Sequence, residues 1–273
     1  MQHLCRVIGN GNELIYAWFE AMHTRVDLML WDNIGADALL RAAGRIEKET
    51  RRIEQLGSRF LPESEVSRIN QAAAGQSVKV SEELCALLAR CMDYARQWNG
   101  LFDITATEGH AGLPCWQRIA IATPYVTRTD SRARIDLSGC LKGYALDRAV
   151  ELAKQEGIHN GLLNFGNSSI GGLGNHPNGK GWPVADEDNP ESIYVLHDEC
   201  LTTSGNNTET RRHIVHPHSG KMVEGKRTAA VMTHSGMEGE VLSIVRFLSD
   251  TQPESHRFAD KPAGNGTNNT NLI

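Results

Sequence analysis

The sequence predicts a mixed α/β fold, of the α+β kind, with sheets and helices in one chain. Three observations lead to this class. Residues 25–31 alternate apolar and polar side chains, as a half-buried strand does, and residues 36–56 repeat apolar side chains at helical spacing. Residues 132–156 read as a strand, a glycine turn and a helix. That arrangement suits ligand binding, because small residues let a ligand approach the end of a helix.

The first half of the chain is expected to contain one strand and two helices. Val26, Leu28 and Leu30 share one face of the strand at 25–31. The helix at 36–56 is followed by Gly57, a residue type that commonly ends helices. A second helix is expected to begin after Ser81, a favoured N-cap, and its acidic first turn suits the positive end of the helix dipole. It should end near residues 99–100, before a loop that contains F-D-I-T.

The second half is expected to contain several short strands and two helices. A strand at 132–137 leads into a helix at 144–156, and a strand at 162–165 leads into a wide glycine-rich loop at 166–175. Further strands are expected at 193–196, 200–203 and 228–232, and a last helix at 238–248. We expect residues 1–21 to be an N-terminal extension and 22–249 the functional domain. Residues 250–273 lack periodic apolar side chains and are expected to be a disordered tail.

Composition narrows the class of protein and its partners. The chain has 273 residues, 40% hydrophobic and 22% charged, which is typical of a globular protein and not of a disordered or collagen-like one. No apolar run reaches membrane-spanning length, so no integral membrane segment is expected. A net charge of -5 gives no broad basic field, so nucleic acid is not an expected partner. Residues 1–11 lack the pattern of a secretory signal, so we expect a cytoplasmic location, or a periplasmic or membrane-anchored one if a signal segment was trimmed.

Taken singly, the polar motifs favour structural interpretations. The six cysteines form no C-x-x-C pair and are expected to be reduced thiols, mostly in the core. His213, His216 and His218 could bind a transition metal, but the proline and glycine around them favour a solvent-facing turn. The segment I-D-L-S-G-C-L-K-G-Y-A-L-D at 135–147 matches neither the dinucleotide fingerprint nor the Walker loop.

The order of the motifs along the chain is more informative than any one of them. The chain contains M-H-T at 22–24, S-R-F-L-P-E-S-E-V-S-R-I-N at 58–70 and G-L-F-D-I-T at 100–105. These are followed by D-L-S-G-x-x-K-G-Y-A-x-D at 136–147, T-T-S-G at 202–205 and H-I-V-H-P-H-S-G at 213–220. In this order they closely resemble the motifs of the ApbE family, whose members are FAD:protein FMN transferases. The resemblance spans about residues 22 to 248.

The resemblance implies an ApbE-like fold with an FAD cleft between mixed sheets and helices. It also implies a set of residues that contact FAD. These are Met22, Phe60, Leu101, Phe102, Asp103, Lys142, Asp147 and His213. Lys142 and His213 are the candidates for contacts to the nucleotide or pyrophosphate. Phe60 stands where the family usually has tyrosine, a change that keeps the aromatic face and removes the hydroxyl.

The resemblance further implies a Mg²⁺ site formed by the Leu141 carbonyl and the side chains at Glu240 and Ile244. Glu240 and His213 are taken as the catalytic residues. The family commonly has aspartate and, four positions later, threonine, whereas this chain reads G-E-V-L-S-I at 239–244. Ile244 has no side-chain oxygen to offer a metal. The family's N-x-G-G-D-like motif is also altered, to N-F-G-N-S-S at 164–169.

The implied activity is protein flavinylation: transfer of FMN from FAD to a threonine or serine hydroxyl of an acceptor protein, with release of AMP. The implied acceptor is a subunit of a redox pump or reductase. Two alternatives stay open from the sequence. Water could replace the acceptor hydroxyl, which would make the protein an FAD pyrophosphatase, or the protein could bind FAD without turnover.

Overall fold

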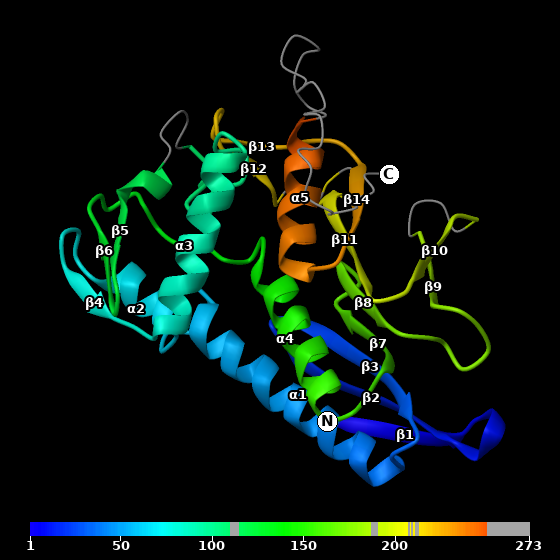
Figure 1. Ribbon diagram of the computed structural model, residues 1–273. Coiled ribbons are helices and arrows are strands. Elements are labelled where there is room, and N and C mark those ends of the chain that lie inside the picture. Colours follow the sequence, from blue (N-terminus) through cyan, green and yellow to red (C-terminus); the bar gives the residue numbers. More distant parts are fainter. Residues whose placement is uncertain (110–114, 187–190, 207, 209, 211–212, 250–273) are drawn as a thin grey trace, which may run out of the picture.

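The computed structural model describes residues 1–109, 115–186, 191–206, 208, 210 and 213–249, and its main feature is an antiparallel sheet of seven strands (Figure 1). All neighbouring strands in this sheet run antiparallel. In spatial order the strands are β1 (Gln2–Val7), β2 (Glu13–Ala21), β3 (Thr24–Asp32), β7 (Asn160–Phe165), β8 (Ser169–Leu173), β11 (Glu199–Asn206) and β14 (Arg227–Thr233).

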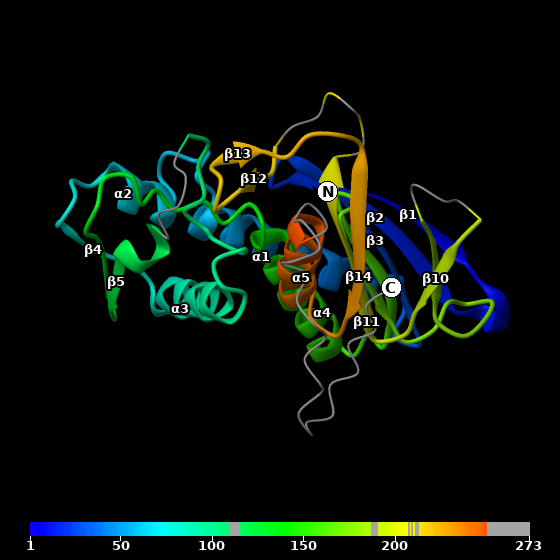
Figure 2. The same ribbon diagram turned by 90° about the horizontal axis from the view of Figure 1, so that it is seen from above.

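Three helices cover one face of this sheet, as Figures 1 and 2 show. They are α1 (Ala36–Gly57), α4 (Leu141–Gln155) and α5 (Gly236–Ser249). Val26, Leu28 and Leu30 on β3 are fully buried toward these helices, in the main hydrophobic core. The hairpin of β9 (Trp182–Ala185) and β10 (Ile193–Leu196) packs on the opposite face, around the buried ring of Trp182. Among the described residues, no helix is both long enough and apolar enough to cross a membrane.

A smaller lobe lies beside the sheet, and α1 reaches toward it (Figure 2). It contains α2 (Glu65–Gln71), β4 (Ser77–Lys79), α3 (Glu82–Gln97), η2 (Cys115–Arg118), β5 (Ile119–Ala122) and β6 (Tyr125–Arg128). The buried guanidinium of Arg128 donates hydrogen bonds to the carbonyls of Ile69, Asn70 and Ala72, so it ties β6 to the end of α2. A short hairpin, β12 (Val215–His216) and β13 (Lys221–Met222), lies near this lobe, and the 3-10 turn η1 (Gly9–Gly11) joins β1 to β2.

Most of the predicted elements are confirmed, and two predictions are wrong. Residues 132–137 form no strand, because the side chain of Asn70 bonds both the N–H and the carbonyl of Ile135 and takes the place of a ladder partner. The predicted loop at 166–175 contains strand β8, which is buried along its whole length. Its glycines are needed there, since a Cβ on Gly172 would lie 2.5 Å from the Cβ of Leu196.

The predicted domain boundary at residue 22 falls in the turn between β2 and β3. These two strands pair over nine positions, from Glu13 with Asp32 to Ala21 with Thr24. Strands β1 and β2 therefore belong to the same sheet as the rest of the domain, and the predicted tail at 250–273 lies outside the described residues. The prediction for the cysteines is confirmed for five buried free thiols, whereas Cys5 is exposed.

Helices α4 and α5 approach each other closely at two glycines. A Cβ added to Gly143 would lie 2.2 Å from the carbonyl oxygen of Gly236, which is a main-chain atom with little freedom to move. Only a residue without a side chain therefore fits at this position. The contact brings the first turn of α4 against the first turn of α5.

We predict that Gly143→Ala lowers the free energy of unfolding by about 2 kcal/mol or more, because the methyl group forces the two helices apart. Gly44→Ala is the matched control, since Gly44 also lies in a helix and a Cβ there meets nothing within 4 Å. The control should gain roughly 0.5–1 kcal/mol from the higher helix propensity of alanine. Urea unfolding of both variants measures the difference, and equal stability of the two would contradict the close contact.

Candidate functional site

Three of the motif segments meet at one end of the seven-stranded sheet. The β2–β3 turn contains Met22, and the β7–β8 turn spans residues 166–168. The N–H of Gly166 donates to the carbonyl of Arg25 at 3.1 Å, which joins these two turns. The N–H of Thr203, in T-T-S-G, donates to the carbonyl of Ser168 at 2.9 Å. The sheet pairing thus brings together segments that are far apart in the sequence.

The Met22–His23 turn has a fixed backbone. Both residues have positive φ angles, 55° and 57°, as the two central residues of a type I′ hairpin turn do. The Met22 N–H donates to Oε1 of Glu54 on α1 at 2.8 Å, which holds the turn against the helix. Gly166 packs so closely on the turn that a Cβ there would lie 2.2 Å from Oγ1 of Thr24. Strained backbone that its surroundings hold in place is common at ligand sites.

Phe60 presents an exposed aromatic ring beside this turn. Its side chain is 52% exposed, unlike the buried aromatic residues of the core. The His23 ring meets it edge-on, with ring centroids 5.0 Å apart, and the Arg59 guanidinium lies 4.2 Å from its centroid. Arg59 in turn forms an ion pair with Asp136 at 2.7 Å. The ring is free to stack on a planar ligand next to a guanidinium, as the resemblance implies.

The turn that leads into α4 is shaped by Asp136. Oδ1 of this carboxylate accepts from the Ser138 N–H at 2.9 Å and from the Ser138 hydroxyl at 2.6 Å, which closes a tight local turn. Cys140, the residue before α4, makes no capping hydrogen bond with its side chain. The Gly143 N–H in the first turn of α4 instead donates to Oε2 of Glu240 at 2.8 Å. A carboxylate from α5 therefore occupies the positive end of α4.

Glu240 is a buried carboxylate whose charge is already balanced. The residue is 5% exposed, and its Oε1 accepts a hydrogen bond of 2.6 Å from the hydroxyl of Ser169 on β8. The ammonium of Lys142 lies 3.4 Å from the same oxygen. Together with the Gly143 N–H, these groups provide the hydrogen bonds and positive charge that a buried carboxylate needs.

These residues do not fit the magnesium site that the sequence predicts at Leu141, Glu240 and Ile244. Both oxygens of Glu240 already accept hydrogen bonds, and an ammonium faces the carboxylate. Ile244 has no side-chain oxygen and packs toward Gly139, where a Cβ would lie 2.9 Å from its Cδ1. No group of three acidic, histidine or cysteine side chains suited to a metal occurs in the described part of the chain. Magnesium prefers several oxygen ligands in octahedral geometry, which this set does not supply.

Asp147, another residue predicted to contact FAD, makes its hydrogen bonds to α5. Its carboxylate accepts from the Ser235 hydroxyl at 2.7 Å and from the N–H groups of Gly236 and Met237 at 2.5 and 3.1 Å. Burial raises the pKa of this carboxyl above its usual value, although these hydrogen bonds oppose the shift. Asp147 thus caps the N-terminus of α5 from the neighbouring helix α4, and a contact with FAD stays a prediction.

The segment 101–103 lies on the smaller lobe and is largely buried. Leu101 and Phe102 are 1% and 3% exposed, so their side chains belong to the core and a ligand would contact their main chain. Asp103 accepts from the N–H and hydroxyl of Thr105 at 2.7 and 2.6 Å. Burial raises the pKa of the Asp103 carboxyl, against the opposing effect of these bonds and of nearby His218.

The histidine segment packs on the same lobe. His218 Nε2 lies 2.9 Å from the carbonyl oxygen of Asn99, and the rings of His216 and His218 are 5.6 Å apart. Burial, together with the charge of His218, lowers the pKa of His216 below its usual value. His213, predicted to be catalytic, lies just before β12 and is exposed. Its catalytic role stays a prediction.

Sequence reasoning missed several polar residues that complete this region. Ser169 was hidden in a glycine-rich stretch, yet its hydroxyl bonds Glu240. Ser204 and Ser243 share a hydrogen bond of 2.7 Å that joins T-T-S-G to α5. Arg59 was visible in S-R-F, but no periodic signal showed that its guanidinium would lie over the Phe60 ring. The Ser169–Glu240 and Ser204–Ser243 pairs join residues distant in the chain, so no local pattern could reveal them.

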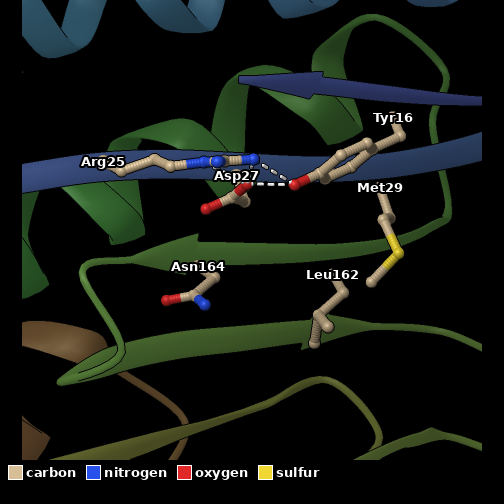
Figure 3. Close-up of a pocket in the computed structure, with 6 residues that line it drawn as sticks. All are labelled: Tyr16, Arg25, Asp27, Met29, Leu162 and Asn164. Carbon is tan, nitrogen blue, oxygen red and sulfur yellow. Dashed lines mark hydrogen bonds and ion pairs between the residues drawn. The ribbon is translucent and has the colours of Figure 1, made fainter. Parts of the chain in front are cut away.

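A separate hollow lies on the opposite face of the sheet, away from the three helices (Figure 3). It has a volume of about 450 Å³. Arg25, Asp27 and Tyr16 converge in it and hydrogen-bond to one another, so their polar groups are partnered internally. The remaining lining residues are Met29, Leu162 and Asn164. None of the residues predicted to contact FAD lines this hollow, so the sheet end described above is the better candidate site.

Comparison with known proteins identifies the family and the fold. A family model described as the ApbE family matches residues 22–264. A protein of Chlamydia trachomatis named FAD:protein FMN transferase is 25% identical over 228 residues, which are 72% of this chain and 71% of the relative. The structure of the flavin transferase ApbE from Vibrio cholerae has a TM-score of 0.72 at 18% identity and covers 86% of each chain. The apo flavinyl transferase ApbE of Pseudomonas stutzeri has a TM-score of 0.75 at 18% identity, over 86% of this chain and 85% of that one. The predicted fold is thereby confirmed.

The half-buried His216 gives a prediction for pH. Its pKa is lower in the folded state than in the unfolded chain, which takes up a proton near the usual pKa of 6.5, so acid favours the unfolded chain. Stability should fall as the pH drops from about 7 to about 5, and His216→Gln should reduce that loss. His3→Gln, in the exposed strand β1, is the control and should leave the slope unchanged. Thermal melts at several pH values measure this, and identical slopes for wild type and His216→Gln would refute it.

Proposed function

This chain belongs to the ApbE family, and on that basis we propose that it transfers FMN from FAD to a threonine or serine hydroxyl of an acceptor protein. The family uses FAD as its substrate, and the curated relative from Chlamydia trachomatis carries the name of this activity. The proposed acceptor is a subunit of a redox pump or reductase. The product would be a protein that carries FMN through a phosphoester bond.

The observation that most strongly supports the proposal is that separate motif segments meet at one end of the sheet. The Met22 turn, the exposed ring of Phe60 and the Lys142–Glu240 pair come from four different elements or turns. The Phe60 ring and Arg59 suit a planar, anionic ligand, and Lys142 places a positive charge at the first turn of α4. A flavin dinucleotide has both properties, namely flat rings and a pyrophosphate.

The reaction is phosphoryl transfer. The acceptor hydroxyl oxygen attacks the FMN-side phosphorus of FAD, and a new P–O bond forms. The bond from that phosphorus to the bridging oxygen breaks, AMP leaves with the electron pair, and the hydroxyl proton is released. Catalysis of this kind depends on positioning and on stabilisation of charge on the phosphoryl oxygens. His213 is proposed as a further pyrophosphate contact. Because the residues at Leu141, Glu240 and Ile244 do not fit Mg²⁺, no step is assigned to the metal that the resemblance implies.

The first test separates this activity from its alternatives. The protein is incubated with FAD, with and without a candidate acceptor subunit, in buffers with and without Mg²⁺. We expect flavin fluorescence on the acceptor band after denaturing electrophoresis, together with stoichiometric AMP. An acceptor variant that lacks the target hydroxyl is the control and should stay unlabelled. FMN released without acceptor would instead indicate a pyrophosphatase, and intact bound FAD would indicate a binding protein.

The second test concerns Asp103. We predict that Asp103→Ala weakens FAD binding by roughly tenfold while the protein still folds, because a lost hydrogen bond to a charged group is worth about 1.5–3 kcal/mol. Calorimetric titration with FAD, FMN and riboflavin measures this, and wild type should bind FAD most tightly. Asp130→Ala is the matched control, since Asp130 also accepts the N–H of the residue two positions later. A large loss of stability with unchanged FAD affinity would assign Asp103 a purely structural role.

A further inference from the structure

The resemblance makes Lys142 a candidate for a nucleotide or pyrophosphate contact, and the structure shows how its ammonium is held. Its ammonium lies 3.4 Å from Oε1 of Glu240, which is an ion-pair distance but too long for a strong hydrogen bond. The side chain is 25% exposed, whereas that of Glu240 is 6% exposed. The ammonium is therefore loosely held and partly open to solvent, while its counter-ion is buried.

Two donors other than Lys142 also bond the Glu240 carboxylate. The Gly143 N–H at 2.8 Å and the Ser169 hydroxyl at 2.6 Å bond its two oxygens, and the carboxylate sits at the positive end of α4. If Lys142 turned toward an incoming anion, these donors would remain in place. The movement would break only the loose ion pair, which a pyrophosphate oxygen would replace.

The same contacts prevent this region from holding a divalent cation. A metal bound by Glu240 would have to displace the hydroxyl or main-chain donor from the carboxylate and lie next to an ammonium. Ile244 would contribute no oxygen, and it is packed against the turn before α4. An ammonium and a divalent cation repel each other at such distances.

We propose that the ammonium of Lys142 supplies the positive charge for the pyrophosphate of FAD at this site, and that FAD binding and transfer need no divalent metal. This inference rests on the proposed function. Lys142 is a catalytic residue in this view, since it contacts the phosphoryl oxygens on which charge accumulates as AMP departs. Glu240 is a positioning residue that holds the ammonium near the end of α4 until FAD binds.

The decisive measurement is FAD affinity in metal-free buffer. Wild-type protein treated with a chelator is titrated with FAD by calorimetry, with and without added Mg²⁺. We expect the two dissociation constants to agree within about threefold, and Lys142→Met to weaken binding by roughly tenfold or more in both buffers. Lys142→Arg, which keeps the charge, should restore most of the affinity. Lys154→Met, near the other end of α4, is the control and should bind FAD as wild type does.

Titration with Mg²⁺ alone and turnover complete the test. Mg²⁺ should give the same heat with wild type as with Glu240→Gln, and AMP release in the presence of acceptor should persist in chelator. Three results would each overturn the inference. The wild type could bind Mg²⁺ where Glu240→Gln does not, the wild type could lose tenfold in FAD affinity when chelator is added, or Lys142→Met could bind FAD as tightly as the wild type. If no acceptor is labelled in any buffer, the proposed transfer fails, and the FAD and Mg²⁺ titrations still decide the role of Lys142.

Discussion

The contact between the first turns of α4 and α5 is the constraint on which the candidate site depends. Gly143 and Gly236 let the two backbones approach, and each helix then receives a carboxylate from the other. Glu240 of α5 bonds the Gly143 N–H of α4, and Asp147 of α4 caps the N-terminus of α5. This reciprocal capping satisfies amides that a helix leaves unpaired at its start. It also fixes where Lys142 and Ile244 lie relative to the sheet.

The sheet supplies the other half of the site. Two tight turns and the strand end at Thr203 are held together by main-chain bonds, so their positions do not depend on side-chain packing alone. The two stretches that depart from the family's usual pattern, at 164–169 and 239–244, also meet here, because the Ser169 hydroxyl bonds Glu240. The Ser169 hydroxyl therefore helps to hold the buried Glu240 carboxylate in place.

Regular local patterns allowed much of the fold to be predicted. Alternation identified β3, helical spacing identified α1, and Ser81 does cap α3 by accepting the Leu84 N–H at 3.2 Å. Failures occurred where a non-local partner decided the structure. The extended segment at Ile135 is satisfied by an asparagine side chain 65 residues away, and β8 is a strand because it is enclosed by β7 and β11. For the site, the order of motifs indicated which residues matter, but it could not show that Asp147 caps a helix or that Glu240 is already compensated.

The β2–β3 turn has one more consequence, which concerns evolution and protein engineering. The family likeness begins at Met22, yet that residue sits at the apex of a hairpin whose other arm precedes it. A polypeptide cut to the conserved segment would leave β3 as a bare edge, with Val26, Leu28 and Leu30 stripped of their neighbours on β2. The segment that the family model matches is thus shorter than the part of the chain that forms the sheet. A truncation at Met22 would therefore remove two strands of the seven-stranded sheet.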